Sequence, residues 1–160
     1  MTARQRLLQA IKGDPSLVER LLVVAEPNMD DPIRDDFDAY RAVAPLCHGM
    51  ATEVLVAVAL DRRLRVINAE ILTRGCDRYC IVDPKQILRW ALLQGRSGAS
   101  GIILAHNHPT GDPTPSQQDI EVTRRVVMAG RAVGIPLSDH IIVGDGDRYT
   151  SMMSDGHMMV

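Results

Sequence analysis

The stretch from His106 to Asp119 reads HNHPTGDPTPSQQD, and it decides both the fold and the chemistry that we expect of this chain. It follows an apolar strand that we predict over 102–105. Because side chains on a strand alternate between its faces, His106 and His108 point the same way if the extended conformation continues through them. The proline-stiffened loop that follows leads into a predicted helix and places Asp119 in its first turn. Two imidazoles and one carboxylate leave a fourth position for water, which is typical of a catalytic zinc site.

Strand and helix patterns alternate on both sides of this stretch. The sequence predicts a β-hairpin over 54–60 and 64–72, followed by a helix over 83–94 that starts at Asp83-Pro84. The strand over 102–105 comes next, then a long helix over 116–134. A final pair of strands is predicted over 136–143 and 148–152. We expect a further helix over 35–48 and a loose, methionine-rich tail after residue 152. Helices interleaved with strands predict an α/β sandwich, and the early hairpin makes its sheet mixed.

The first part of the chain has a different texture. Helical spacing of apolar residues predicts short helices over 3–12 and 16–25, and a polar, acidic, proline-bearing linker follows over 26–36. We therefore expect two parts, an N-terminal helical extension and linker over 1–45 and a catalytic domain over 46–160.

Composition excludes several classes of protein. The chain has 160 residues, of which 46% are hydrophobic, so it can bury a core. No apolar run reaches the roughly 18 residues of a membrane span, and no secretory signal is evident, so we expect no membrane partner. Cys47, Cys76 and Cys80 are an odd, irregularly spaced set, which favours reduced thiols and a cytoplasmic location.

Hydrolysis at a zinc site also needs a base and a hydrogen-bond donor. Glu53, at the start of the buried run 54–60, is expected to lie in a partly dry place, whereas Glu70 lies in a more polar strand and is expected to be solvated. Ser116 is placed to offer a hydroxyl. Taken alone, however, Glu53 fits an ordinary surface carboxylate. Ser116 and Asp119 taken alone fit a helix-capping box, and we expect Asp119 to serve only one of its two possible purposes.

Three further features have plainer interpretations. His140 lies in an apolar strand and is expected to be a hydrogen-bonded core histidine rather than a ligand. Asp145 and Asp147 lie in a predicted hairpin turn, which lacks the length and the closing glutamate of a calcium loop. The letters HNH alone do not make an HNH nuclease site, and the zinc deaminase signature is absent.

The order and spacing of the candidate residues form a known pattern: Glu53, then His106-x-His108, seven residues, Ser116, two residues and Asp119. It resembles the JAMM motif of the JAB/MPN metalloprotease superfamily. Residues 46–152, which include the segment IPLSDHIIVGDGDRY, resemble the RadC-type branch in particular. The resemblance implies a cytidine-deaminase-like α/β sandwich, in agreement with the order of elements predicted above.

The resemblance also implies a role for each site residue. His106, His108 and Asp119 would be zinc ligands, Glu53 the general base that deprotonates zinc-bound water, and Ser116 the group that stabilises the tetrahedral intermediate. The implied reaction is hydrolysis of a peptide or isopeptide bond in a protein or peptide substrate, such as a ubiquitin-like modifier or a sulfur-carrier protein. The alternative is a DNA-repair-associated, RadC-like accessory protein without proven peptidase activity.

Two observations rank the alternative second. The formal net charge is −2 and only 3% of the residues are aromatic, whereas a nucleic-acid-binding domain is usually basic and often offers aromatic stacking. RadC-type proteins usually carry an upstream helix-hairpin-helix segment with a Gly-x-Gly hairpin. Residues 1–45 contain a single glycine, Gly13. We therefore do not expect nucleic acid to be the partner.

Overall fold

The computed structural model describes residues 31–75 and 83–159. The helices expected over 3–12 and 16–25, together with Cys76 and Cys80, lie outside the described residues. Within them, the elements follow in the order α3, β1, β2, α4, β3, α5, β4, β5; their bounds are Asp36–Cys47, Val54–Leu60, Val66–Arg74, Pro84–Leu92, Gly101–Asn107, Gln117–Val133, Leu137–Val143 and Tyr149–Ser151.

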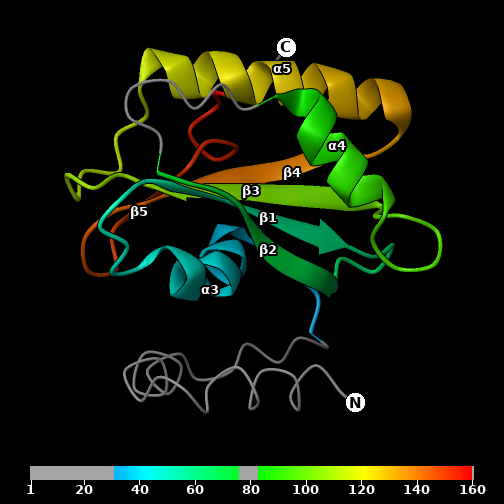
Figure 1. Ribbon diagram of the computed structural model, residues 1–160, viewed down its shortest axis with the longest axis horizontal. Helices are drawn as coiled ribbons and strands as arrows, with labels where there is room; N and C mark the ends of the chain where they lie inside the picture. The colour runs from blue at the N-terminus through cyan, green and yellow to red at the C-terminus, as the bar shows by residue number, and fades with distance from the viewer. Residues whose placement is uncertain (1–30, 76–82, 160) are drawn as a thin grey trace.

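The five strands form one mixed sheet in the order β2-β1-β3-β4-β5 (Figure 1). β1 pairs antiparallel with both β2 and β3, β3 pairs parallel with β4, and β4 pairs antiparallel with β5. α5 makes the crossover between the two parallel strands. The expected α/β fold with a mixed sheet is confirmed, including the early hairpin that brings β2 to one edge.

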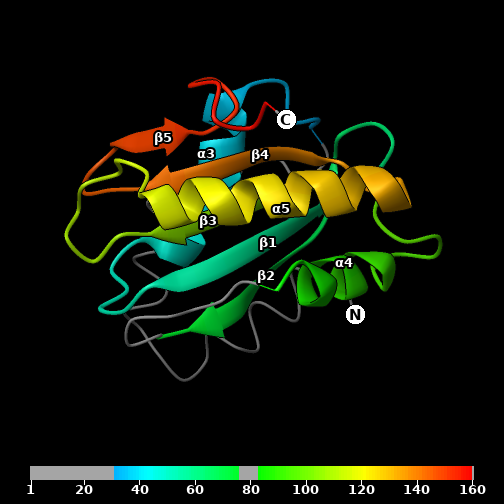
Figure 2. The ribbon, with the colours of Figure 1, turned by 90° about the horizontal axis from the view of Figure 1, so that it is seen from above.

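Helices cover both faces of the sheet. α3 packs against one face, and α4 and α5 lie over the other (Figures 1 and 2). β1 and β3 are buried along their whole length, because they lie inside the sheet and between two layers of helix. Their side chains alternate between the two cores: Leu55 and Leu104 face α4 and α5, whereas Val56 and Ala105 face α3.

Local sequence signals set the ends of the helices. Asp83 caps α4 and Pro84 occupies its first turn. Ser116 caps α5, and Gly134 ends that helix with a φ of 75°. This left-handed conformation is the usual reason for a glycine after a helix. The proline-bearing loop therefore joins the end of β3, at Asn107, to the capped first turn of α5.

The tail after β5 is not loose, contrary to our expectation. Met152 and Met158 are buried in the core beneath α4 and α5. Backbone hydrogen bonds also close this segment into turns, with the N–H of Asp155 bonded to the Ser151 carbonyl and that of His157 to the Met152 carbonyl. The expectation was wrong because unbranched methionine side chains fill irregular gaps in a core as readily as they cover a surface.

No helix in the described part of the chain is long and apolar enough to cross a membrane.

Candidate metal centre

The sheet brings the two histidines to the first turn of α5. β3 runs to Asn107, two residues beyond the strand end expected from the sequence, so His106 lies within the sheet. Its side chain shares the face of Ile102 and Leu104, which is the face that α5 covers. His108 follows directly, and its backbone N–H continues the pairing with β4 by bonding to the Val143 carbonyl at 3.3 Å. Asp119 is the third residue of α5.

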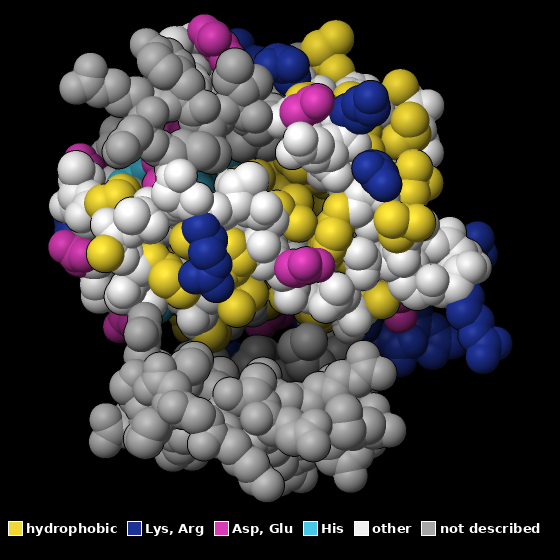
Figure 3. All heavy atoms as spheres, in the orientation of Figure 1, with side chains coloured by type: hydrophobic (Ala, Val, Ile, Leu, Met, Phe, Trp, Pro, Cys, Tyr) yellow, Lys and Arg dark blue, Asp and Glu magenta, His cyan; other side chains and the backbone are white. Residues whose placement is uncertain are grey.

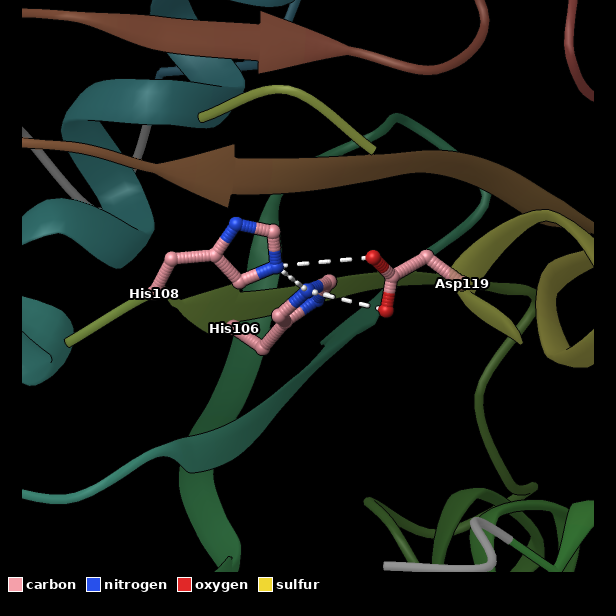
Figure 4. Close-up of side chains that lie close together, drawn as sticks. All are labelled: His106, His108 and Asp119. Carbon is pink, nitrogen blue, oxygen red and sulfur yellow. Dashed lines mark hydrogen bonds and ion pairs between the residues drawn. The ribbon is translucent and has the colours of Figure 1, made fainter. Parts of the chain in front are cut away.

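The three side chains converge on one point, as the close-up in Figure 4 shows. The Nε2 atoms of His106 and His108 lie 3.0 Å apart. Asp119 Oδ1 lies 3.2 Å from His106 Nε2, and its Oδ2 lies 3.4 Å from His108 Nε2. One potential ligand atom from each residue lies within 4.8 Å of the others. The structure thus brings together the three residues that the sequence predicts as metal ligands.

The donor set fits a divalent zinc ion. His108 Nδ1 lies 2.7 Å from the carbonyl oxygen of Asp112, which can only accept, so this ring nitrogen carries the proton. In the neutral ring, Nε2 then offers a lone pair toward Asp119 and His106. A carboxylate and imidazole nitrogens that face one another need a cation or a proton between them. Two nitrogens and one carboxylate match a zinc site with an open position.

The capping box expected as the plainer interpretation is also present. The Ser116 backbone N–H and its hydroxyl both donate to Asp119 Oδ2 at 2.7 Å, and Asp119 N–H donates to Ser116 Oγ at 3.1 Å. Our expectation that Asp119 would serve one purpose only was wrong, because its Oδ1 still faces His106 while Oδ2 closes the box. The cap holds this carboxylate in place beside the imidazoles.

Electrostatics at the centre favour an ionised carboxylate. Burial alone would raise the pKa of Asp119, but the neighbouring imidazoles of His106 and His108, together with the hydrogen bond from Ser116, hold it well below its usual range. The hydrogen bond to Asp119 raises the pKa of His108 above 6.5, against a smaller opposing effect of burial. The negative charge of Asp119 therefore favours positive charge between these three side chains, which is the position that a cation would take.

Glu53 lies just before β1 and is exposed, so the partly dry environment that we expected for it is wrong. The strand begins one residue later, and burial begins with it, at Val54. The antiparallel register pairs Leu55 with His106, which puts Glu53 opposite His108 when it is extended by two residues. Its negative charge also contributes to the raised pKa of His108.

Glu70, the other candidate, is exposed on β2 and accepts a hydrogen bond of 2.7 Å from Trp90 Nε1.

Three polar residues, His140, Thr123 and Asn107, lie at the centre although the sequence assigns none of them a role there. His140 is a buried, hydrogen-bonded core histidine, as predicted, but its Nε2 also lies 2.8 Å from His106 Nδ1. Its Nδ1 lies 2.6 Å from the hydroxyl of Thr123. Burial, followed by the influence of His106, lowers the pKa of His140 well below its usual value. Asn107 bonds to the backbone before and at the start of β1. The one available signal was a polar residue, His140, within an apolar strand; nothing in the sequence pattern marked Asn107 or Thr123.

Part of the centre reaches the surface. His106 is buried and His108 is partly exposed. Figure 3 shows histidine surface at the left end of the visible face, which in Figure 1 is the end where β3 leads into the loop before α5.

The fold and this centre define a mixed-sheet α/β domain with a His-His-carboxylate site at the junction of a central strand and a helix. Residues 33–157 match the family model described as the RadC-like JAB domain. The chain belongs to this family.

Curated relatives support the same assignment. A UPF0758 protein of Methanococcoides burtonii is 38% identical over 132 residues, which cover 81% of this chain and 56% of the relative. A UPF0758 protein of Geobacter sulfurreducens is 43% identical over 104 residues, which cover 65% of this chain and 44% of the relative. A UPF0758 protein of Bacillus cereus is 37% identical over 126 residues, which cover 79% of this chain and 54% of the relative. The chain thus spans about half the length of the curated relatives that it matches. Their names state no activity.

Proposed function

We propose that this domain is a zinc-dependent metallopeptidase that hydrolyses a peptide or isopeptide bond in a protein substrate. The observation that carries the proposal is the convergence of His106 Nε2, His108 Nε2 and the Asp119 carboxylate within 4.8 Å at the first turn of α5. Membership of the RadC-like JAB family supports a hydrolase of this kind. A cytoplasmic location follows from the cysteine usage described above and is part of the proposal.

Each site residue has a distinct task in this proposal. His106, His108 and Asp119 would hold the zinc ion. When bound, zinc would polarise the scissile carbonyl and make water more acidic. Glu53, across the strand pair from His108, takes the proton of the attacking water and delivers it to the leaving amine. Its exposure lets it reach solvent and substrate alike. The Ser116 hydroxyl turns from its bond with Asp119 Oδ2 to the oxygen on which negative charge develops.

The substrate class rests on the resemblance to JAMM proteases. We propose a protein tail joined through a peptide or isopeptide bond, such as that of a ubiquitin-like or sulfur-carrier protein. The DNA-associated alternative has no observation in the described residues that favours it over the peptidase.

The experiment uses the full chain and a matched pair of substitutions. Purified protein is loaded with zinc, its metal content is measured, and cleavage of a peptide library is followed by mass spectrometry. Glu53→Gln removes the base and none of the proposed ligands, so this variant should keep one zinc ion per chain and lose cleavage. Glu70→Gln makes the same chemical change at an exposed glutamate on β2 and should leave both unchanged.

Two outcomes would overturn the proposal. Wild-type protein that retains no zinc after loading lacks the centre on which the reaction depends. Equal cleavage by Glu53→Gln and wild type would remove the base from its assigned role.

A further inference from the structure

A buried chain of hydrogen bonds runs behind the metal centre. It begins at His106 Nδ1, which lies 2.8 Å from His140 Nε2. It continues from His140 Nδ1 to Thr123 Oγ1 at 2.6 Å and ends at the Asp119 carbonyl oxygen, 2.6 Å from that hydroxyl. His106, His140 and Thr123 are 3%, 2% and 0% exposed. Both ends of the chain therefore belong to proposed ligand residues, and its interior is closed to water.

Counting protons fixes the direction of the last two bonds, from His140 to Thr123 and from Thr123 to the Asp119 carbonyl. A separation of 2.6 Å between electronegative atoms requires a hydrogen between them. The Asp119 carbonyl has none to give, so the single hydroxyl hydrogen of Thr123 points at it. The hydrogen between Thr123 Oγ1 and His140 Nδ1 must then come from the imidazole. His140 is therefore protonated at Nδ1.

Counting ring protons in the same way assigns the protonated nitrogen of His106. His140 is enclosed in the core, and its hydrogen-bond partners are a hydroxyl and another imidazole, so its neutral form is the one that this environment accommodates. With its one ring proton on Nδ1, His140 can only accept at Nε2. His106 then donates its own proton from Nδ1, and its Nε2 is left with a free lone pair. That atom faces Asp119 and His108.

We propose that Thr123 and His140 are positioning residues that hold His106 in the Nδ1-protonated tautomer and so present its Nε2 lone pair to the metal. The inference rests on the proposed metal site and deepens it, because it names residues outside the ligand set that decide whether the site is ready to bind. His108 reaches the same tautomer by a separate route, through the Asp112 carbonyl. The two imidazoles are thus prepared independently, one by a loop and one by the core.

The group that accepts the hydrogen bond from His106 Nδ1 also affects how basic the His106 ring is as a ligand. Metal-bound histidines often donate to a carboxylate, which makes the ring more basic. Here the acceptor is a neutral imidazole, so His106 gains orientation with little added negative charge. The single carboxylate of the centre, Asp119, then supplies the only formal negative charge of the proposed ligand set.

The test compares Thr123→Val with Thr123→Ser in the full chain. Valine has nearly the volume of threonine but no hydroxyl, so His140 loses its acceptor at Nδ1, moves its proton to Nε2 and donates to His106. Long-range ¹H–¹⁵N spectra of the metal-free protein should show His106 protonated at Nδ1 in wild type and in Thr123→Ser, and at Nε2 in Thr123→Val. Zinc affinity, measured by competition with a chelating dye, should fall by about 10–100-fold in the valine variant only.

A second pair of variants, at His140, separates loss of the hydrogen bond from a change in packing. His140→Gln keeps an acceptor toward His106 and a donor toward Thr123, whereas His140→Leu keeps neither, so only leucine should weaken zinc binding. Unchanged His106 protonation in Thr123→Val would overturn the inference, even if zinc affinity fell. Failure of wild-type protein to bind zinc would refute the proposed function, while the spectra of the metal-free protein would still decide the tautomer.

Discussion

Asn107 Oδ1 accepts a hydrogen bond of 2.8 Å from the backbone N–H of Val54, so the residue between the two imidazoles holds the start of β1 in place. Its Nδ2 donates to the Thr52 carbonyl at 3.2 Å. The two bonds bracket Glu53, the proposed base. Asn107 is buried, and its side chain lies on the face of the sheet opposite to that of His106. One strand end therefore positions both the proposed ligands and the proposed base.

Asn107→Ala should lower stability and disturb Glu53 without removing a ligand. It leaves a buried N–H and a carbonyl without their partner, which costs about 1–3 kcal/mol of unfolding free energy. Zinc stoichiometry should stay at one ion per chain, and the cleavage rate should fall. Urea denaturation, metal analysis and the cleavage assay measure the three effects.

The control is Asn68→Ala on β2. The Asn68 amide donates to the Gln94 side chain rather than to backbone, so its loss leaves no buried backbone group unpaired. A loss of stability equal to that of Asn107→Ala would contradict the special role of Asn107.

Gly144 lets the loop after His108 pack against the end of β4. A Cβ atom at Gly144 would lie 2.7 Å from the Gly111 carbonyl oxygen and 2.8 Å from Pro113 Cδ. Gly144→Ala should therefore push away the loop that orients His108 through the Asp112 carbonyl. We expect a loss of about 1–3 kcal/mol of stability, as for overpacking in a core, and weaker zinc binding. Denaturation and chelator competition measure these effects.

Gly101→Ala makes the same change at the first residue of β3, at the end of the strand far from His106. Its Cβ would have no neighbour closer than Ser138 Oγ at 3.4 Å, so zinc affinity should stay at the wild-type value. If both alanine variants bind zinc as wild type does, loop packing at Gly144 does not position His108.

Periodicity and spacing predicted most of the fold and the convergence of the ligand residues. Alternation along β3 predicts that His106 and His108 share a face, and the capping signal at Ser116 predicts where Asp119 begins its helix. These signals are local, so they can be read from neighbouring residues. The end of β3 is not a local signal, because the strand reaches His106 through its pairing with β1 and Asn107 through its pairing with β4.

Features that depend on distant packing could not be read in the same way. The exposure of Glu53 depends on where burial of β1 begins, which is at Val54, and the burial of Met152 and Met158 depends on the gap left beneath two helices. His140 was recognised as a core residue, but its contact with His106 depends on the register between β3 and β4. No spacing along the chain reports that register.

Leu64 has a strained backbone in the turn between β1 and β2. Its φ is 61°, in the left-handed region that favours glycine, and its side chain is exposed. A residue with a Cβ atom pays about 1–2 kcal/mol to adopt this conformation. Leu64→Gly should therefore raise the free energy of unfolding by about 1 kcal/mol, after the extra entropy of glycine in the unfolded chain is subtracted. Urea denaturation measures the gain.

Leu64→Ala separates backbone strain from loss of the exposed leucine side chain. Alanine keeps the Cβ atom, so it should give no comparable gain. Equal stabilisation by alanine and glycine would show that the leucine side chain, rather than its backbone conformation, is the source of the cost.

Asp139 makes stability depend on pH through a group away from the metal centre. This buried carboxyl accepts hydrogen bonds from the Ser151 hydroxyl at 2.6 Å and from the backbone N–H groups of His140 and Met153 at 2.7 and 3.1 Å. Burial nevertheless raises the pKa of Asp139 above 3.8, against the smaller opposing effect of these bonds. The folded protein therefore holds this proton at a pH where the unfolded chain has released it.

The sign of the effect follows from this difference in bound protons. Between 3.8 and the folded pKa of Asp139, the folded state binds more protons, so its contribution to stability falls as pH rises. Asp139→Asn cannot ionise, and its amide keeps an oxygen for the two backbone donors and an N–H for Ser151. The stability of the variant relative to wild type should therefore rise as the pH increases from 3.8 to the folded pKa of Asp139. Denaturant unfolding at several pH values measures the trend, with Asp155→Asn, an exposed residue of the tail, as a control. A difference between variant and wild type that stays constant with pH would show that Asp139 ionises equally easily in both states, and that its three hydrogen bonds fully offset its burial.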